Sequence, residues 1–138
     1  MEDNIFNLKI ASIGHFISRS GTLFLHSLLD NHPQILTIPG TLNLIDILKK
    51  KNLNAKSCFD LFEKSNPKFF DTSLFKEIDP NSSGLWALGK NKDDKIITDK
   101  ELFKNYYFKS LENRKINPRN VIISIYYAYA KVQKKDLK

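Results

Sequence analysis

IASIGHFISRSGTLFLHSLLDNHPQILTIPG, residues 10–40, is the stretch that decides the fold expected for this chain. Residues 9–16 are mostly apolar, as in a strand that is covered on both faces. A short polar turn with one glycine follows, and residues 22–30 then have helical periodicity, with Leu25, Leu28 and Leu29 on one stripe. The pattern predicts a strand, a tight turn and a helix that packs on the strand through these leucines.

The turn between the predicted strand and helix has the composition of an anion-binding site. The first amides of a helix have no partner within the helix, and the helix dipole places partial positive charge there. The hydroxyls of Ser20 and Thr22 can donate hydrogen bonds, and Arg19 supplies a planar guanidinium suited to phosphate or sulfate oxygens. A turn that only caps the helix would not need Arg19. We therefore expect a phosphate or sulfonate group at residues 19–23.

Two other phosphate-binding motifs do not fit these residues. A Walker loop requires Gly-Lys followed by Ser or Thr, and Gly21 is followed by Thr22 instead. A cysteine-phosphatase loop requires a thiolate where this chain has Phe16. We therefore expect neither ordinary ATP or GTP chemistry nor phosphatase chemistry.

The same residues resemble the 5′-phosphosulfate-binding loop of sulfotransferases that use 3′-phosphoadenosine 5′-phosphosulfate (PAPS). That loop has Arg or Lys, Ser, Gly, Thr and a second Thr, then an apolar helix that often ends in His-Pro. Here RSGT at residues 19–22 and His-Pro at residues 32–33 match, whereas Leu23 stands in place of the second Thr. The resemblance covers about thirty residues, so it is more specific than a lone glycine-rich loop.

The resemblance implies an α/β fold with a P-loop-like parallel sheet flanked by helices. It also implies transfer of a sulfuryl group from PAPS to a hydroxyl or amine acceptor, which the sequence does not identify. Arg19 would then be catalytic, because it would neutralise the leaving phosphate. The cofactor-binding residues implied by the resemblance are Arg19, Ser20, Gly21, Thr22 and Leu23.

A catalytic base is not identified. Some branches of the family carry a Glu near position 40, where this chain has Gly40. His15 ends the predicted strand near the loop. It is the one histidine that we would test for contact with substrate. His26 is interpreted as a packing residue and His32 as a helix-end residue. The last two are six positions apart and cannot share a helix face, so no metal site is predicted.

A second, weaker similarity lies at NPRNVIIS, residues 117–124, which looks like the family's 3′-phosphate segment with Ser124 at the position of its serine. The upstream arginine of that segment is replaced by Ile116, and no strand pattern precedes it. We therefore favour an amphipathic helix that starts at Asn117 and Pro118, with Ser124 facing a neighbouring element. A 3′-phosphate ligand at Ser124 is the alternative.

The remaining pattern contains more helices than strands. A second strand is predicted at residues 35–38, and a capping box opens with Thr98. Further helices are predicted at residues 41–51, 57–64, 98–112 and 117–135. Because a parallel sheet needs several strands, we interpret residues 1–138 as a single, partial domain, the N-terminal portion of a longer enzyme. The alternative is a small helical domain with a minimal sheet.

Composition limits the partners. The chain of 138 residues is 41% hydrophobic and 27% charged, as globular proteins are, and its net charge is +7. The lysines are spread widely without a nucleic-acid-binding motif, so we predict an anionic nucleotide rather than nucleic acid as partner. No signal peptide or spanning segment is present in the sequence, which predicts a cytoplasmic protein without a membrane partner. The single cysteine, Cys58, is expected to be buried, and the oligomeric state is not indicated.

Two classes of function therefore remain open at this point. One is a sulfotransferase, of which this stretch alone would be inactive. The other is a non-catalytic nucleotide-binding or interaction module that has kept the loop. The departures at Leu23 and Gly40 favour the module.

Overall fold

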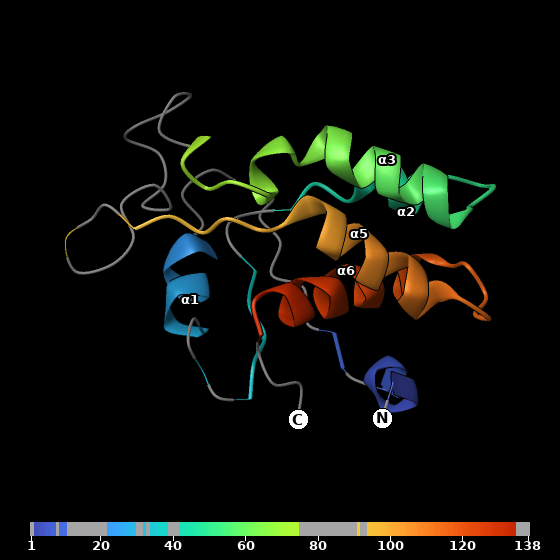
Figure 1. The fold of residues 1–138 in the computed structure, drawn as a ribbon, viewed down its shortest axis with the longest axis horizontal. Helices are drawn as coiled ribbons and strands as arrows, with labels where there is room; N and C mark the ends of the chain where they lie inside the picture. The colour runs from blue at the N-terminus through green and yellow to red at the C-terminus, as the bar shows by residue number, and fades with distance from the viewer. Residues whose placement is uncertain are drawn as a thin grey trace.

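A hairpin of two helices organises the fold in the computed structural model, which describes residues 2–7, 9–10, 22–29, 32, 34–38, 42–74, 91 and 94–134. Helices α5 (Lys100–Leu111) and α6 (Pro118–Val132) are its arms, and α3 (Ala55–Ser65) lies alongside them (Figure 1). The short elements are η1 (Glu2–Asn7), α1 (Thr22–Leu29), α2 (Ile45–Lys49) and η2 (Pro67–Phe69). None of the helices in these ranges is long and apolar enough to cross a membrane.

The three long helices begin at side chains that cap them. Asn54, Asp99 and Asn117 each accept a backbone N–H of the following turn through a side-chain oxygen, at 2.8, 2.9 and 2.9 Å. Pro118 occupies the first position of α6, where its missing N–H costs nothing. The predicted start of this helix at Asn117 is confirmed.

An antiparallel bridge joins the segment before α5 to the segment after η2. Asp71 pairs with Ile97, and the backbone N–H of Thr98 donates to the carbonyl of Phe70 at 2.9 Å. This pairing buries Thr98. The cap of α5 is consequently Asp99, one residue after the predicted Thr98.

Aromatic side chains build the main core between α3 and the hairpin. Phe62 stacks on Phe103 with ring centroids 5.9 Å apart, and Phe69 lies 5.6 Å from Tyr129. Cys58 is fully buried in the same cluster, as predicted, and this burial raises the pKa of its thiol. Burial of each large side chain contributes about 1.5–3 kcal/mol, so this cluster is the principal source of stability in the described part of the chain.

The predicted P-loop-like parallel sheet is wrong for the part of the chain that the structure describes, which contains no β-strand. Lys9 and Ile10, at the start of the first predicted strand, are irregular and exposed, and residues 11–16 lie outside the described residues. Residues 35–38, the second predicted strand, are also irregular. A short apolar run does not by itself distinguish a strand from an irregular segment. The helical alternative, with one isolated bridge, describes these residues better.

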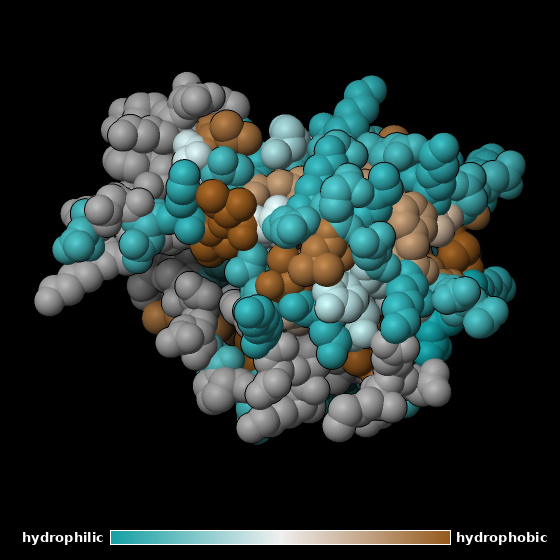
Figure 2. Space-filling view, viewed as in Figure 1, coloured by the Kyte–Doolittle hydropathy of each residue, from teal (hydrophilic) through white to brown (hydrophobic). Residues whose placement is uncertain are grey.

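Apolar side chains of two short helices are exposed. Leu25 and Leu28 of α1 are 45% and 61% exposed, so the prediction that α1 packs through this stripe is wrong. Helix α2 is shorter than the predicted residues 41–51, and it buries Ile47 while Ile45 and Leu48 are exposed. On the face of the molecule shown in Figure 2, exposed apolar areas lie among polar side chains.

Candidate anion site at the start of helix α1

Helix α1 starts at the residue where the predicted turn ends, which confirms the helix predicted over residues 22–30. Of the five predicted site residues, Thr22 and Leu23 are the first two of this helix. Arg19, Ser20 and Gly21 lie outside the described residues. The structure therefore locates the helical half of the predicted site, and the role of Arg19 stays a prediction.

The start of α1 has the polarity that an anion requires. In a helix the first backbone N–H groups point outward without an internal partner, and they carry partial positive charge. No acidic side chain is present in the first turn of α1, so nothing within this turn offsets that charge. An anion placed before Thr22 would meet backbone donors and a favourable dipole.

His26 connects α1 to the main core. Its Nε2 atom lies 3.0 Å from the carbonyl oxygen of Ile38, at a distance for a hydrogen bond in which the ring N–H donates. Ile38 is buried with the aromatic core residues. His26 is thus partly buried and engaged by the backbone, which confirms its interpretation as a packing residue.

His32 lies just after the end of α1. Its backbone N–H donates to the carbonyl of Leu29 at 3.3 Å, and its exposed ring accepts a hydrogen bond from the N–H of Gln34 through Nδ1 at 3.2 Å. This confirms its helix-end position. The candidate base His15, like Gly40, is outside the described residues.

Within the residues that the structure describes, no three His, Cys, Asp or Glu side chains are close enough together to hold a metal ion.

Ser124 is a packing residue of α6. It is fully buried, and its Oγ donates to the carbonyl oxygen of Asn120 one turn earlier, at 2.8 Å. The hydroxyl is therefore used inside the helix and faces the core. The interpretation of residues 117–124 as an amphipathic helix is confirmed, and in this structure Ser124 does not present its hydroxyl to a ligand.

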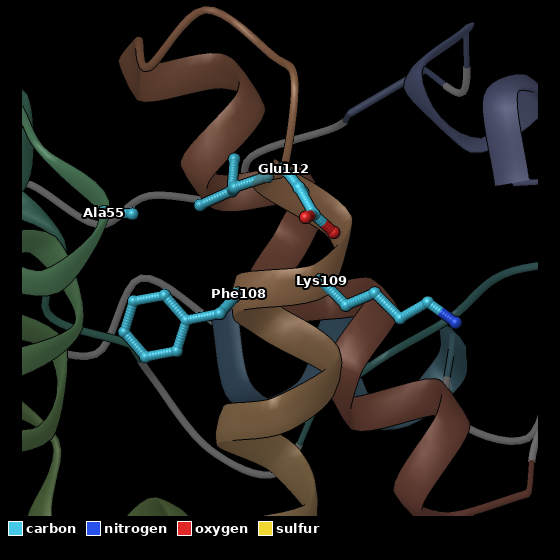
Figure 3. Close-up of a pocket in the computed structure, with 5 residues that line it drawn as sticks. Ala55, Phe108, Lys109 and Glu112 are labelled. Atoms are coloured by element: carbon cyan, nitrogen blue, oxygen red, sulfur yellow. The ribbon is translucent and has the colours of Figure 1, made fainter.

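Two depressions lie on the helical core, and neither contains a predicted site residue. The first has a volume of about 410 Å³ and is lined by Ala55, Phe108, Lys109, Leu111 and Glu112. In Figure 3 Phe108 and Lys109 point to opposite sides of α5, so these two side chains do not converge on one ligand. Its two charged residues, Lys109 and Glu112, are exposed, and we assign the depression no chemistry.

The second depression also has a volume of about 410 Å³ and lies beside α3 and η2. Lys100 and Glu63 form an ion pair at its edge. The other lining residues are Asp60, Lys64, Pro67 and Phe70. Because the two lysines of this rim are matched by two carboxylates, we do not assign an anion site to the depression.

Sequence reasoning assigned no role to two arginines that the structure brings onto the N-terminal segment. Arg119 donates from Nη1 to the carbonyl oxygen of Phe6 at 2.7 Å. The guanidinium carbon of Arg114 lies 3.9 Å from the centroid of the Phe6 ring. The signal available in the sequence was the adjacent pair Ile5 and Phe6 in an otherwise polar segment.

Comparison with protein-family models, with curated proteins and with solved structures finds no match to this chain. The resemblance to PAPS-dependent sulfotransferases therefore rests on sequence pattern alone, chiefly within residues 10–40.

Proposed function

We propose that residues 19–23 bind the 5′-phosphate end of a 3′-phosphoadenosine nucleotide. The observation that carries this proposal is the start of α1 at Thr22, directly after Arg19-Ser20-Gly21. A phosphate at this place would be held by the first amides of the helix and by the guanidinium of Arg19. The more specific proposal is that PAPS binds here and donates its sulfuryl group to a hydroxyl or amine acceptor.

Arg19 has the central role in that reaction. Sulfuryl transfer breaks the bond between sulfur and the bridging oxygen of the 5′-phosphate, so negative charge builds up on that oxygen. A positioned guanidinium and backbone N–H groups stabilise such charge without reorganising during the reaction. The acceptor loses a proton as the new sulfur–oxygen or sulfur–nitrogen bond forms, and His15 is the residue we would test as its base.

A non-catalytic nucleotide-binding module is the second candidate. The described residues contain no strand, whereas the fold implied by the resemblance has a parallel sheet. Leu23 also replaces the usual second Thr, and the Glu of some family branches is missing near Gly40. The missing sheet and the missing Glu concern the catalytic machinery, so they favour binding without turnover. By the resemblance the second Thr would donate to the 5′-phosphate, so Leu23 leaves only its backbone N–H for the anion.

The binding proposal is tested by calorimetric titration of adenosine 3′,5′-bisphosphate into wild type, Arg19→Ala and Lys9→Ala. Lys9 is an exposed lysine, so the control variant removes the same charge from the same region. A charge-assisted hydrogen bond contributes about 1.5–3 kcal/mol, which corresponds to a loss of binding of roughly tenfold to a hundredfold for Arg19→Ala. Equal affinity in the wild type and Arg19→Ala, or a preference for ATP, would overturn the proposal.

Turnover separates the two candidates. The wild-type protein, together with any residues that its gene encodes after position 138, is incubated with PAPS and a panel of hydroxyl and amine acceptors, and release of adenosine 3′,5′-bisphosphate is measured. Acceptor-dependent release that Arg19→Ala abolishes supports the sulfotransferase. Tight binding of the bisphosphate without acceptor-dependent release supports the non-catalytic module.

A further inference from the structure

Positive charge is concentrated at one end of the helical core. The connection between α2 and α3, with the residues that flank it, is KKKNLNAK at residues 49–56, which contains four lysines and no acidic residue. The turn between α5 and α6, residues 112–117, adds an arginine and a lysine against one glutamate. The two segments therefore carry a net charge of +5, out of +7 for the whole chain. We call the two segments together the basic end.

Contacts between α3 and α5 bring the two segments of the basic end together. The Tyr107 hydroxyl donates to the carbonyl oxygen of Ala55 at 3.1 Å. Ala55, Leu111 and Glu112 line the same depression. Figure 1 shows both connections at the same end of the helices, on the right of the view. Charges that are far apart in the sequence therefore act on one region of the surface.

The lysines of the first segment are available to a partner. Lys49, Lys51 and Lys56 are exposed, and Lys50 is partly buried. Within the described residues none of these four lysines forms an ion pair. A partner with negative charge would therefore not have to break an existing ion pair to reach them.

The acidic residues that flank the first segment in the sequence face other parts of the molecule. Asp46 accepts a hydrogen bond from the hydroxyl of Ser65, the last residue of α3, at 3.2 Å. Asp60 lines the other depression, together with Lys64 and Lys100. The positive charge of the basic end is thus not neutralised by these two carboxylates.

An apolar depression adjoins the lysines of the basic end. Its volume of about 410 Å³ is in the range of ligand-binding clefts, and Ala55, Phe108 and Leu111 supply its apolar walls. In Figure 3 the Phe108 side chain extends from α5 toward α3, on which Ala55 lies. Ala55 directly precedes Lys56 in α3. Apolar surface and positive charge are therefore neighbours here.

An acidic peptide segment that carries an apolar side chain matches both properties. Opposite charge attracts such a segment to the basic end, and burial of its apolar side chain in the depression removes apolar surface from water. A bilayer surface is flat, so it would leave the depression unfilled. A nucleic acid is bound chiefly through its phosphates, which gain nothing from an apolar depression. The combination of lysines and a hollow thus favours a protein segment as the partner.

We propose that the basic end is a docking surface for an acidic segment of a partner protein, which places one apolar side chain in the depression between α3 and α5. The lysines of residues 49–56 attract the segment, and Ala55, Phe108 and Leu111 contact its apolar side chain. This surface goes beyond nucleotide binding at residues 19–23 and does not depend on it.

The main test measures binding of a fluorescent peptide, a run of glutamates with one central leucine, to the full chain by fluorescence anisotropy. One variant replaces by Gln the four lysines Lys49, Lys50, Lys51 and Lys56. The control variant replaces by Gln four exposed lysines outside the basic end, Lys9, Lys64, Lys95 and Lys134. The first variant should bind roughly tenfold more weakly or worse, and the control should lose about threefold at most. Equal losses would contradict the proposal, because net charge alone would then explain the binding.

A variant of opposite sign excludes loss of fold as the explanation. Glu112→Gln removes the one acidic residue of the basic end and should strengthen peptide binding by about twofold or more, because a like charge is removed. Glu101→Gln, at an exposed residue of α5 outside the basic end, should leave the affinity unchanged. An unfolded protein does not gain affinity. Unchanged or weaker binding by Glu112→Gln would count against the basic end as the site.

The depression is tested by changing the peptide. A peptide with serine in place of the central leucine should bind about tenfold more weakly, because it buries no apolar side chain. Vesicles that contain phosphatidylserine and duplex DNA are measured as competing partners. Equal binding of the two peptides, or stronger binding of the vesicles or the DNA than of the leucine peptide, would overturn the proposal.

Discussion

The helical core and the helix α1 use similar sequence patterns with opposite results. Phe62 and Phe103 of the core are almost completely buried and stack on each other. Leu25 and Leu28 of α1 also lie on one stripe of a helix, yet they are largely exposed. An apolar stripe therefore predicts that a helix forms, but its burial depends on whether a partner surface reaches it.

Chain connectivity explains part of this difference. α5 and α6 are joined by the short turn at residues 112–117, so little chain entropy is lost when their apolar faces meet. The turn is closed by Asn113, whose φ of 63° is a conformation that asparagine tolerates better than most residues. α1 has no such adjacent partner among the described elements, and the hydrogen bond from His26 to Ile38 connects it to the core. The candidate anion site thus lies at the start of a helix whose Leu25 and Leu28 are exposed.

The largest effect that tests this contrast is expected from Phe62→Ala, with Leu28→Ala as its matched control. Phe62 contacts Phe69, Phe70 and Phe103, so its truncation leaves a cavity in the main core. The free energy of unfolding should fall by about 3–5 kcal/mol, against about 0.5 kcal/mol or less for Leu28→Ala. Urea denaturation followed by circular dichroism measures both. Equal losses would mean that α1 is as well packed as the core.

A smaller effect is expected from the cap of α6. Asn117→Ala removes the side-chain oxygen that accepts the N–H of Asn120 at 2.9 Å. The loss should be about 1 kcal/mol in the free energy of unfolding, again by urea denaturation. Asn120→Ala is a useful comparison, because it keeps the cap and removes only the bond from Nδ2 to the Lys115 carbonyl. A cap variant as stable as the wild type would show that tertiary packing alone holds the start of α6.

The smallest effect is expected at Asp71, beside the bridge. The hydroxyl of Ser73 and its backbone N–H both donate to the Asp71 carboxylate, and they hold its pKa below the usual value. A lowered pKa in the folded state means that the stabilisation is present above about pH 4 and is lost as the pH falls through the folded value. Ser73→Ala should therefore raise the pKa of Asp71 in an NMR titration. An unchanged pKa would show that the Ser73 hydroxyl does not stabilise the carboxylate.

Local sequence chemistry was enough to predict several elements. The starts of α1 and α6, the helical state of residues 117–124 and the burial of Cys58 were all predicted correctly. In each case the signal is short-range. An asparagine before a proline caps a helix within one turn, and an apolar stripe repeats every three or four residues.

The predicted sheet was wrong because the pairing of strands is a long-range property that a local apolar run does not encode. Ile10 and residues 35–38 are apolar enough for a strand, but in the structure they are irregular. The candidate anion site could be predicted only in part. Its helical half follows from local pattern, whereas the place of Arg19 depends on residues outside the described ones and stays a prediction.

The sequence by itself determined that α1 starts at Thr22 and that Asn117 and Pro118 start α6, because these features depend on neighbours within one or two turns. Anion binding at the turn before Thr22 stays a prediction. Only the tertiary structure decided that α6 is buried on two faces. Its second face is covered by Ile5 and Phe6, which are more than one hundred residues away in the chain, and by the arginine contacts to Phe6. The periodicity of α6 does not predict this contact, because the burial of a helix face depends on the segment that packs against it as well as on the helix.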